Sequence, residues 1–358
     1  MEKTNFKSIL KRGKDDYINY LIVIAGFVVL SILSGTGILG KAYVGLLVPV
    51  CCWIIMAISL NVTVGILGEL SLGHAGFMSI GAFTGIIIAE SMRDSVPESW
   101  IRLILAIIIG AIITAVFGFL IGIPVLRLNG DYLAIVTLAF GEIIKELVNC
   151  LIVGVDSNGI HFIFNVNGAK SASDLNLEEG GRAIIKGAQG ATGTTTIATF
   201  LGGCILLMVV LIIVQNFKRS RSGRAVMAIR DNKIAAESSG INVTKFKMIA
   251  FVISAGIAGA AGALYGLNFS SIVATKFDFN TSILVLVYVV LGGLGSIRGS
   301  IVAALVLYVL PEVLRAFSTY LMLVYAIVLI LVMVCTNSPQ VKAFIQKILP
   351  KKAKKGGN

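Results

Sequence analysis

The chain has 358 residues, of which 57% are hydrophobic and 13% are charged, and its mean hydropathy is +0.94. Soluble domains carry about a quarter of charged residues, so this composition excludes an ordinary soluble enzyme or binding domain. The net charge of +12 does not indicate nucleic-acid binding, because the basic residues lie between and beyond apolar runs. That is where the positive-inside rule places them in a membrane protein.

Repeated apolar runs of about twenty residues predict an all-α polytopic membrane protein with about 8–10 transmembrane helices. An alternative with eight spans treats 43–90 and 281–316 as irregular or re-entrant, because glycines interrupt both regions. The ten-span version places helices at 18–39, 43–66, 70–90, 101–123, 131–152, 196–217, 248–269, 281–296, 299–316 and 318–336.

Basic residues set the expected orientation of these spans. The basic segments 1–17 and 337–358 are expected in the cytoplasm, on either side of a transmembrane domain over 18–336, and so is the basic loop 218–247. Both the eight-span and the ten-span versions satisfy this arrangement. They place the polar segment 153–195 outside, where it is either a cap on the mouth of the protein or a contact surface for an external partner.

Glycine is frequent within the spans and recurs at intervals of three or four residues, which place several glycines on one helix face. In lipid, such faces permit close helix packing, so a structural role is the preferred interpretation. The glycines with this spacing are Gly81, Gly85, Gly118, Gly122, Gly256, Gly259, Gly262 and Gly266.

Ionisable side chains within the membrane zone are rare and therefore candidates for function. Glu142 and Lys145 have the spacing of a pair on one helix face. Glycines around Glu69 and His74 indicate a broken helix or a close helix contact near the bundle axis. His74 is interpreted as a hydrogen-bonded packing residue in preference to a proton relay. The candidates for lining a transport pathway are Asn61, Glu69, Ser71, His74 and Glu142.

The sequence contains no motif for catalysis or for binding a cofactor. It lacks the G-x-x-x-x-G-K-[ST] motif of a nucleotide-binding P-loop, and its five cysteines and two histidines show no metal-ligand spacing. We therefore expect a transport subunit without enzymatic activity, catalytic residues, a metal site or a cofactor of its own.

The basic loop has the pattern of short helices. Gly223-Arg224 is expected to open one helix, and Asp231 or Asn232 to cap a second over Lys233–Ser239. Gly240 suits the left-handed position after that helix. With Ala235, Ala236, Ser238 and Ser239 facing outward, the loop would form a knob for a groove on another protein; the alternative is a solvated loop near anionic lipid.

The chain resembles the membrane subunits of bacterial ABC importers for branched-chain amino acids, specifically the longer of the usual two permeases. The resemblance covers most of the chain from about 60 to 315, in the family's order. The matching stretches are LNVTVGILGELSLGHAGFMSIGAFTG (60–85), LNGDYLAIVTLAFGEIIKELV (128–148), NGI (158–160), SGRAVMAIRDNKIAAESSGINVTKFKMIAFVISAGIAGAAGALYG (222–266) and VVLGGLGSIRGSIVAALVLYVLPEVLR (289–315).

This resemblance implies a permease fold like that of ribose and vitamin B12 importers in the bacterial cytoplasmic (inner) membrane. It implies a second homologous permease, two cytoplasmic ATPases that bind ATP and Mg, and an extracytoplasmic binding protein. It maps 224–247 onto the family's coupling loop, although Ile234 stands where many importers have Glu. The residues expected to couple the chain to the ATPases are Arg224, Arg230, Ala235, Ala236, Glu237 and Gly240.

The leading hypothesis is therefore a pathway subunit with alternating access driven by separate ATPases. One alternative is a self-contained ion-coupled transporter that uses Glu69, His74 and Glu142. Others are an ABC permease for urea, amides or another amino acid, and a membrane scaffold without transport. The assignment of leucine, isoleucine and valine rests on the resemblance alone.

Overall fold

The computed structural model describes residues 41–314 except 129, 157–158, 166–171, 176 and 178–180, together with 20–32 except 22 and positions 36, 323, 326, 327 and 330. The chain divides into two compact units, Met1–Ala304 and Leu305–Asn358, and the description below concerns the first. The predicted cytoplasmic segments 1–17 and 337–358 lie outside the described residues, as does most of the predicted span 318–336.

The described part of the first unit is mostly helical, which confirms the predicted polytopic all-α architecture. Four of its helical segments are long and apolar enough to cross a membrane: Tyr43–Leu67, Ser99–Val125, Phe200–Arg219 and Val243–Gly266. An apolar helix covers Val23–Ile32. It is followed by α2 (Lys41–Asn61), α3 (His74–Ser91), α4 (Ser99–Val125), α5 (Asp131–Asn149), α6 (Phe200–Arg219), α7 (Arg221–Asp231), α8 (Lys233–Ser238), α9 (Val243–Gly266), α10 (Phe279–Gly292) and α11 (Ile297–Val313), of which α11 continues into the second unit.

Helix α2 passes directly into a π-helix, η1 (Val62–Leu67), and the chain then leaves helical geometry until α3 begins at His74. Gly68 follows η1 with a φ of 83°, a conformation that glycine adopts without strain. Of the two alternatives predicted around Glu69, the structure therefore shows the broken helix. Short π-helical segments are uncommon and frequently lie at functional sites.

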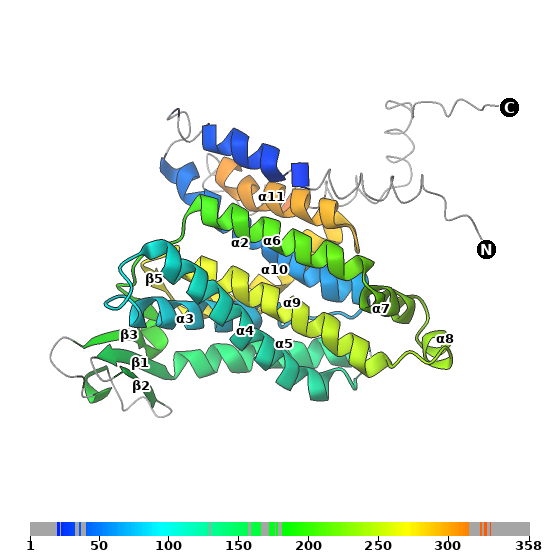
Figure 1. The fold of residues 1–358 in the computed structure, drawn as a ribbon, viewed down its shortest axis with the longest axis horizontal. Helices are drawn as coiled ribbons and strands as arrows, with labels where there is room; N and C mark the ends of the chain where they lie inside the picture. The colour runs from blue at the N-terminus through cyan, green and yellow to red at the C-terminus, as the bar shows by residue number, and fades with distance from the viewer. Residues whose placement is uncertain are drawn as a thin grey trace. The chain divides into compact units, whose positions relative to one another are not determined.

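Helix α9 lies among α2, α3 and α4 and forms the centre of the first unit (Figure 1). Its glycines allow the neighbouring backbones to approach closely. A Cβ atom on Gly262 would lie 2.0 Å from the carbonyl oxygen of Met78 in α3, and one on Gly81 would lie 2.0 Å from that of Gly259. Further glycines expected to pack helices also lie against small residues: Gly85 against Ala263, Gly266 against Ala82, and Gly256 against Ala111 and Ala115.

The segment 153–195, described above as a polar loop, instead contains most of a small antiparallel sheet. Its strands are β1 (Leu151–Asp156), β2 (Gly159–Phe164), β3 (Arg182–Lys186) and β4 (Ala191–Thr192), and β5 (Ser271–Ile272) completes the order β2-β1-β3-β4-β5. Short 3₁₀ turns follow the strands: η2 (Ala172–Leu175), η3 (Gly187–Gln189) and η4 (Ala274–Phe277). These strands were not predicted, because the segment is polar overall and each strand has only two to six residues.

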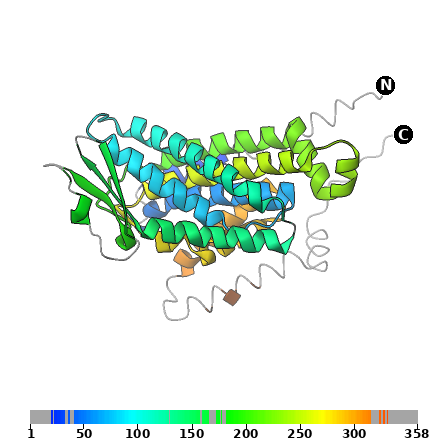
Figure 2. The ribbon, with the colours of Figure 1, turned by 90° about the horizontal axis from the view of Figure 1, so that it is seen from below.

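The sheet and the short helices α7 and α8 lie at opposite ends of the helices of the first unit, as both ribbon views show (Figures 1 and 2). Strand β5 lies between α9 and α10 in the sequence and pairs with β4. The sheet therefore anchors the connection between these two helices at one end. The short helices α7 and α8 connect α6 to α9 at the other end.

Candidate functional site

Helix α7 begins at a side-chain cap. The Ser220 Oγ accepts a hydrogen bond from the backbone N–H of Gly223 at 3.0 Å, so α7 begins at Arg221. The expectation that Gly223-Arg224 opens this helix was therefore wrong by two residues. Small polar caps of this kind satisfy N–H groups that a helix start leaves free.

Helix α8 follows the expected pattern. Asn232 caps it by accepting a hydrogen bond from the backbone N–H of Ala235 at 3.0 Å, and the helix covers Lys233–Ser238. Gly240 has a φ of 80°, the left-handed conformation expected of a residue that ends a helix. Cap, helix and terminating glycine were all predictable because each depends only on neighbouring residues.

Of the four side chains of α8 and its end that were expected to face outward, that of Ala236 does not. Ala236 is buried and packs with Ile229 of α7 and Val243 of α9, so it faces inward rather than outward. Ala235 and Glu237 are exposed, and the side chain of Ile234 is 76% exposed. The outer surface of α8 therefore presents an aliphatic side chain beside small and acidic residues.

Arg230 joins α7 to the helical bundle. Its Nη1 donates to the carbonyl oxygen of Gly65 in η1 at 2.8 Å, and its Nη2 donates to Asp231 at 3.0 Å. Arg224, in contrast, is exposed, and its Nη1 donates to the carbonyl oxygen of Arg219 at 2.7 Å. Of these two predicted coupling residues, only Arg230 extends to another part of the bundle.

Behind Gly65, Asn61 connects α2 to the turn between α10 and α11. Its Oδ1 accepts from the backbone N–H of Gly295 at 2.8 Å, and its Nδ2 donates to Ser300 Oγ at 3.1 Å. Lys218, near the end of α6, donates to the carbonyl oxygen of Gly295 at 3.3 Å. We call the residues Asn61, Gly65, Lys218, Arg230 and Gly295 the junction; they connect α2, α6, α7 and the α10–α11 turn.

The predicted pathway residue Asn61 is 1% exposed, and the junction leaves no room beside it. A Cβ atom on Gly65 would lie 1.9 Å from Asn61 Oδ1 and 2.3 Å from the nitrogen of Gly295. Only glycine fits at this position. The geometry gives Asn61 a joining role between helices.

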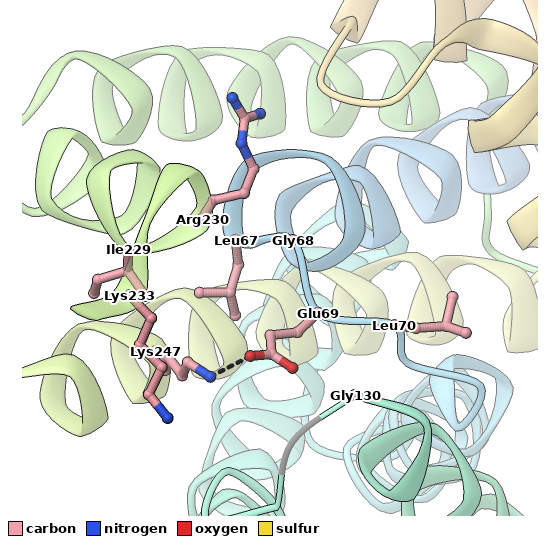
Figure 3. Close-up of a pocket in the computed structure, with 9 residues that line it drawn as sticks. All are labelled: Leu67, Gly68, Glu69, Leu70, Gly130, Ile229, Arg230, Lys233 and Lys247. Carbon is pink, nitrogen blue, oxygen red and sulfur yellow. Dashed lines mark hydrogen bonds and ion pairs between the residues drawn. The ribbon is translucent and has the colours of Figure 1, made fainter. Parts of the chain in front are cut away.

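Glu69 forms an ion pair with Lys247, near the start of α9 (Figure 3). The Lys247 side chain is 4% exposed and that of Glu69 is 16% exposed. Lys247 is the last residue of the basic loop 218–247 predicted from the sequence, yet its side chain lies buried within the bundle. Its sequence neighbours gave one signal, since Lys247 directly precedes the apolar run of α9.

Ser71 and His74 belong to a buried hydrogen-bonded cluster. His74 Nε2 lies 3.1 Å from Ser59 Oγ and 3.0 Å from Ser254 Oγ, and its Nδ1 lies 3.5 Å from Ser71 Oγ. Ser254 Oγ also donates to the carbonyl oxygen of Ser59 at 2.7 Å. This arrangement is that of the expected packing histidine, and it joins α2, α3 and α9.

Glu142 pairs with Lys145 on α5, as its spacing predicts. Its second carboxylate oxygen accepts a hydrogen bond from the backbone N–H of Phe279 at 3.1 Å. Phe279 is the first residue of α10, where a helix leaves N–H groups unsatisfied and favours negative charge. Glu142 therefore holds the start of α10 against the side of α5.

Several members of these contacts were not among the predicted site residues: Gly65, Lys218, Gly295 and Ser300 around the junction, Lys247 beside Glu69, Ser59 and Ser254 around His74, and Phe279 beside Glu142. The glycines of the α10–α11 turn were recognised only as interruptions of a span, although Gly293 and Gly295 have φ values of 89° and 79°. Within the described ranges no group of histidine, cysteine and acidic residues could hold a metal ion.

Comparison with known proteins places these features in a family. The family model described as "Branched-chain amino acid transport system / permease component" matches residues 42–334. The chain is 37% identical over 287 residues to the high-affinity branched-chain amino acid transport system permease protein LivM of Salmonella typhimurium, covering 79% of this chain and 66% of that protein. It is 37% identical over 292 residues to LivM of Escherichia coli K12, with the same coverage of both chains.

A second type of permease also matches. The chain is 26% identical over 268 residues to the permease protein LivH of Salmonella typhimurium, covering 74% of this chain and 82% of LivH. No solved structure matches the chain. The chain spans 66% of the length of the two LivM proteins. On the extent of the family match, this multi-pass membrane protein belongs to the permease-component family of the branched-chain amino acid transport systems.

Proposed function

We propose that the chain is a transmembrane pathway subunit of an ATP-driven importer for branched-chain amino acids. The observation that carries this proposal is the connection between α8 and the bundle: an exposed surface on a short helix, attached through α7 and Arg230 to η1. A force applied to α8 would reach α2, α6 and the α10–α11 turn through the junction. This arrangement suits a subunit driven by a separate motor.

The end that carries α7 and α8 is proposed to face the cytoplasm, because the basic residues of the loop are expected on that side. Two ATPases, which would bind ATP and Mg, would contact α8 there. Ile234 would enter an apolar groove, since a side chain that is 76% exposed gains by leaving water. The sheet at the other end would be the contact surface for an extracytoplasmic binding protein.

A second permease is also part of this proposal. The chain is similar to both LivM and LivH, which are two permease proteins described for branched-chain amino acid transport. We take this chain as the LivM-like member of such a pair. The substrate pathway would lie between the two permeases.

The structure favours this function over an ion-coupled transporter. Glu69 is paired with Lys247, Glu142 with Lys145, and His74 with serine hydroxyls. Paired charges are poor candidates for cycles of ion binding and release, because each release would leave an opposite charge unpaired in a region of low dielectric.

Reconstitution tests the proposed function. Proteoliposomes would contain the chain, an LivH-like permease and the ATPases, with the binding protein and radiolabelled leucine on the outside. We expect uptake that requires ATP inside and stops when the ATPases are omitted. Uptake by the chain alone under a proton or sodium gradient would instead support the ion-coupled transporter.

Docking by α8 is tested with a matched pair of substitutions. Ile234→Asp should abolish copurification of the ATPases, because it places a charge on the proposed contact. Ile160→Asp changes an exposed isoleucine of β2 at the opposite end and should leave copurification unchanged. Retention of the ATPases by Ile234→Asp would overturn the docking proposal.

A further inference from the structure

A pocket of about 380 Å³ lies where α7 and α8 meet the bundle (Figure 3). It is lined by Leu67 at the end of η1 and by the loop that follows (Gly68, Glu69 and Leu70). The other lining residues are Ile229 and Arg230 of α7, Lys233 of α8, Lys247 of α9, and Gly130 before α5. Its volume is in the range of small-molecule sites, which is about 300–1,000 Å³. None of the functions argued above uses this pocket.

The charged groups of the pocket have both signs. Lys247 and Glu69 meet within it, and the ammonium group of Lys233 lies on the same side, whereas the Arg230 guanidinium points away toward η1 (Figure 3). Lys247 engages Glu69 through Oε1, and no described residue donates to Oε2. The pocket therefore offers one free carboxylate oxygen beside two lysine side chains.

Aliphatic side chains complete the lining. Leu67, Leu70 and Ile229 contribute apolar surface at the same site. A free phosphate would gain from the lysines but would be repelled by Glu69 and would leave the aliphatic surface unused. A zwitterion with an aliphatic side chain complements all three features, because its amine, carboxylate and side chain each find a partner.

We propose that this pocket binds a free aliphatic amino acid, with the ammonium on Glu69, the carboxylate on Lys233 and Lys247, and the side chain against Leu67 and Ile229. This inference rests on the proposed function for the choice of amino acid and for the side from which it enters. The occupant would be transported substrate that has accumulated in the cytoplasm.

Binding at this place would restrain the coupling movement. The lining residues come from α7 and α8 on one side and from η1, the loop after it, α9 and Gly130 on the other. One ligand would therefore hold α8 against the bundle. A ligand that binds one of two conformations shifts the equilibrium toward it. The site would therefore slow import when the internal amino acid concentration is high.

The direct test measures binding of radiolabelled leucine to the complete permease–ATPase complex in nanodiscs, without binding protein. We expect saturable binding that Lys233→Gln weakens at least about tenfold, the effect of removing one charged hydrogen-bond partner. Lys233→Arg keeps the charge and should retain most of the affinity. Saturable binding of leucine that is equal in wild type and Lys233→Gln would overturn the assignment, as would binding of inorganic phosphate but no leucine.

The functional test preloads proteoliposomes with leucine and measures initial ATP-driven uptake with and without it. The readout is the ratio of the two rates in each variant, so a change in basal rate does not affect it. We expect internal leucine to slow uptake several-fold in wild type and not in Lys233→Gln. Uptake that ignores internal leucine in wild type overturns this inference alone, whereas failure of all ATP-driven uptake overturns the proposed function.

Discussion

Arg230 donates a hydrogen bond from Nη1 to the carbonyl oxygen of Gly65 at 2.8 Å, and this bond joins α7 to the π-helix at the end of α2. The stem of Arg230 also lies over Gly68, where a Cβ atom would come within 2.5 Å of its Cγ. The Arg230 side chain therefore contacts two glycines, Gly65 and Gly68, and fits beside Gly68 because that residue has no side chain. A movement of α7 would act on η1 through the contacts of Arg230 with Gly65 and Gly68.

Substitution of Arg230 should separate ATP hydrolysis from transport. Arg230→Gln keeps a polar stem but loses the charged hydrogen bond to Gly65, which is worth about 1.5–3 kcal/mol. We expect the ATPases to copurify normally while the amount of leucine transported per ATP falls about tenfold. Uptake and phosphate release are measured together in proteoliposomes.

Arg221→Gln is the matched control for this prediction, because Arg221 is exposed at the start of α7. It should retain the transport-to-hydrolysis ratio of the unmodified chain. An equal loss in both variants would show that positive charge on α7, rather than the bond to Gly65, matters.

The junction should tolerate no side chain at Gly65. Gly65→Ala would place a methyl group 1.9 Å from Asn61 Oδ1, and the displaced groups should cost about 1–3 kcal/mol. Gly45→Ala in α2 meets nothing within 4 Å and should leave stability unchanged or slightly increased. Thermal unfolding midpoints of the two purified variants should therefore differ in this order, and a reversed order would contradict the described junction.

A second glycine pair tests the packing of α9. Gly262→Ala would bring a methyl group 2.0 Å from the carbonyl oxygen of Met78, whereas Gly256→Ala would meet Ala115 Cβ at 3.4 Å. We expect a clear fall in the unfolding midpoint for the first and a small change for the second, because backbone atoms cannot move aside as a flexible side chain does. Equal effects would mean that α3 and α9 are farther apart than described.

The local features of this chain could be predicted from sequence because they depend on near neighbours. The cap at Asn232, the left-handed Gly240 and the pair Glu142–Lys145 each involve residues within a few positions of one another. The long helices could also be predicted, because the length of an apolar run is a property of consecutive residues. Spacing on one helix face identified the glycines of α9.

The junction could not be predicted in this way, because its contacts join residues far apart in the sequence. Arg230 and Gly65 are 165 positions apart, and Asn61 and Gly295 are 234 positions apart. The pair of Lys247 with Glu69 joins residues 178 positions apart, so the position of Lys247 next to an apolar run could indicate burial but not this partner. The sheet was missed for a different reason: its strands are short, and strand β5 follows α9, far from the other four.

His74 offers a test of proton coupling. His74→Ala would leave buried hydroxyls of Ser59 and Ser254 without one partner, which should lower stability by about 1–3 kcal/mol. If His74 only packs, the pH dependence of ATP-driven uptake should be the same in His74→Ala and the unmodified chain. A flattened pH profile in the variant would instead assign it a role in proton transfer. His74→Gln, which keeps hydrogen-bonding capacity, should recover part of the stability.

Glu142 provides the sharpest test of a pathway residue. It carries two roles, since one oxygen pairs with Lys145 and the other accepts from Phe279 N–H at the start of α10. Glu142→Gln retains an acceptor for Phe279 but removes the charge, whereas Glu142→Ala removes both. Glu146→Gln is the control, because Glu146 is an exposed carboxylate 3.6 Å from the same Lys145.

We expect Glu142→Ala to lower both stability and uptake, because α10 loses its fixed start and Lys145 its main partner. Glu142→Gln should fold normally and yet slow uptake about tenfold, the effect of one lost charged interaction, while Glu146→Gln stays near the unmodified rate. Uptake is measured at saturating ATP, and unfolding midpoints are measured on the same preparations. Normal uptake by Glu142→Gln would restrict Glu142 to holding α10 in place, because the carboxamide can still accept the Phe279 hydrogen bond but cannot carry the charge that a pathway role requires.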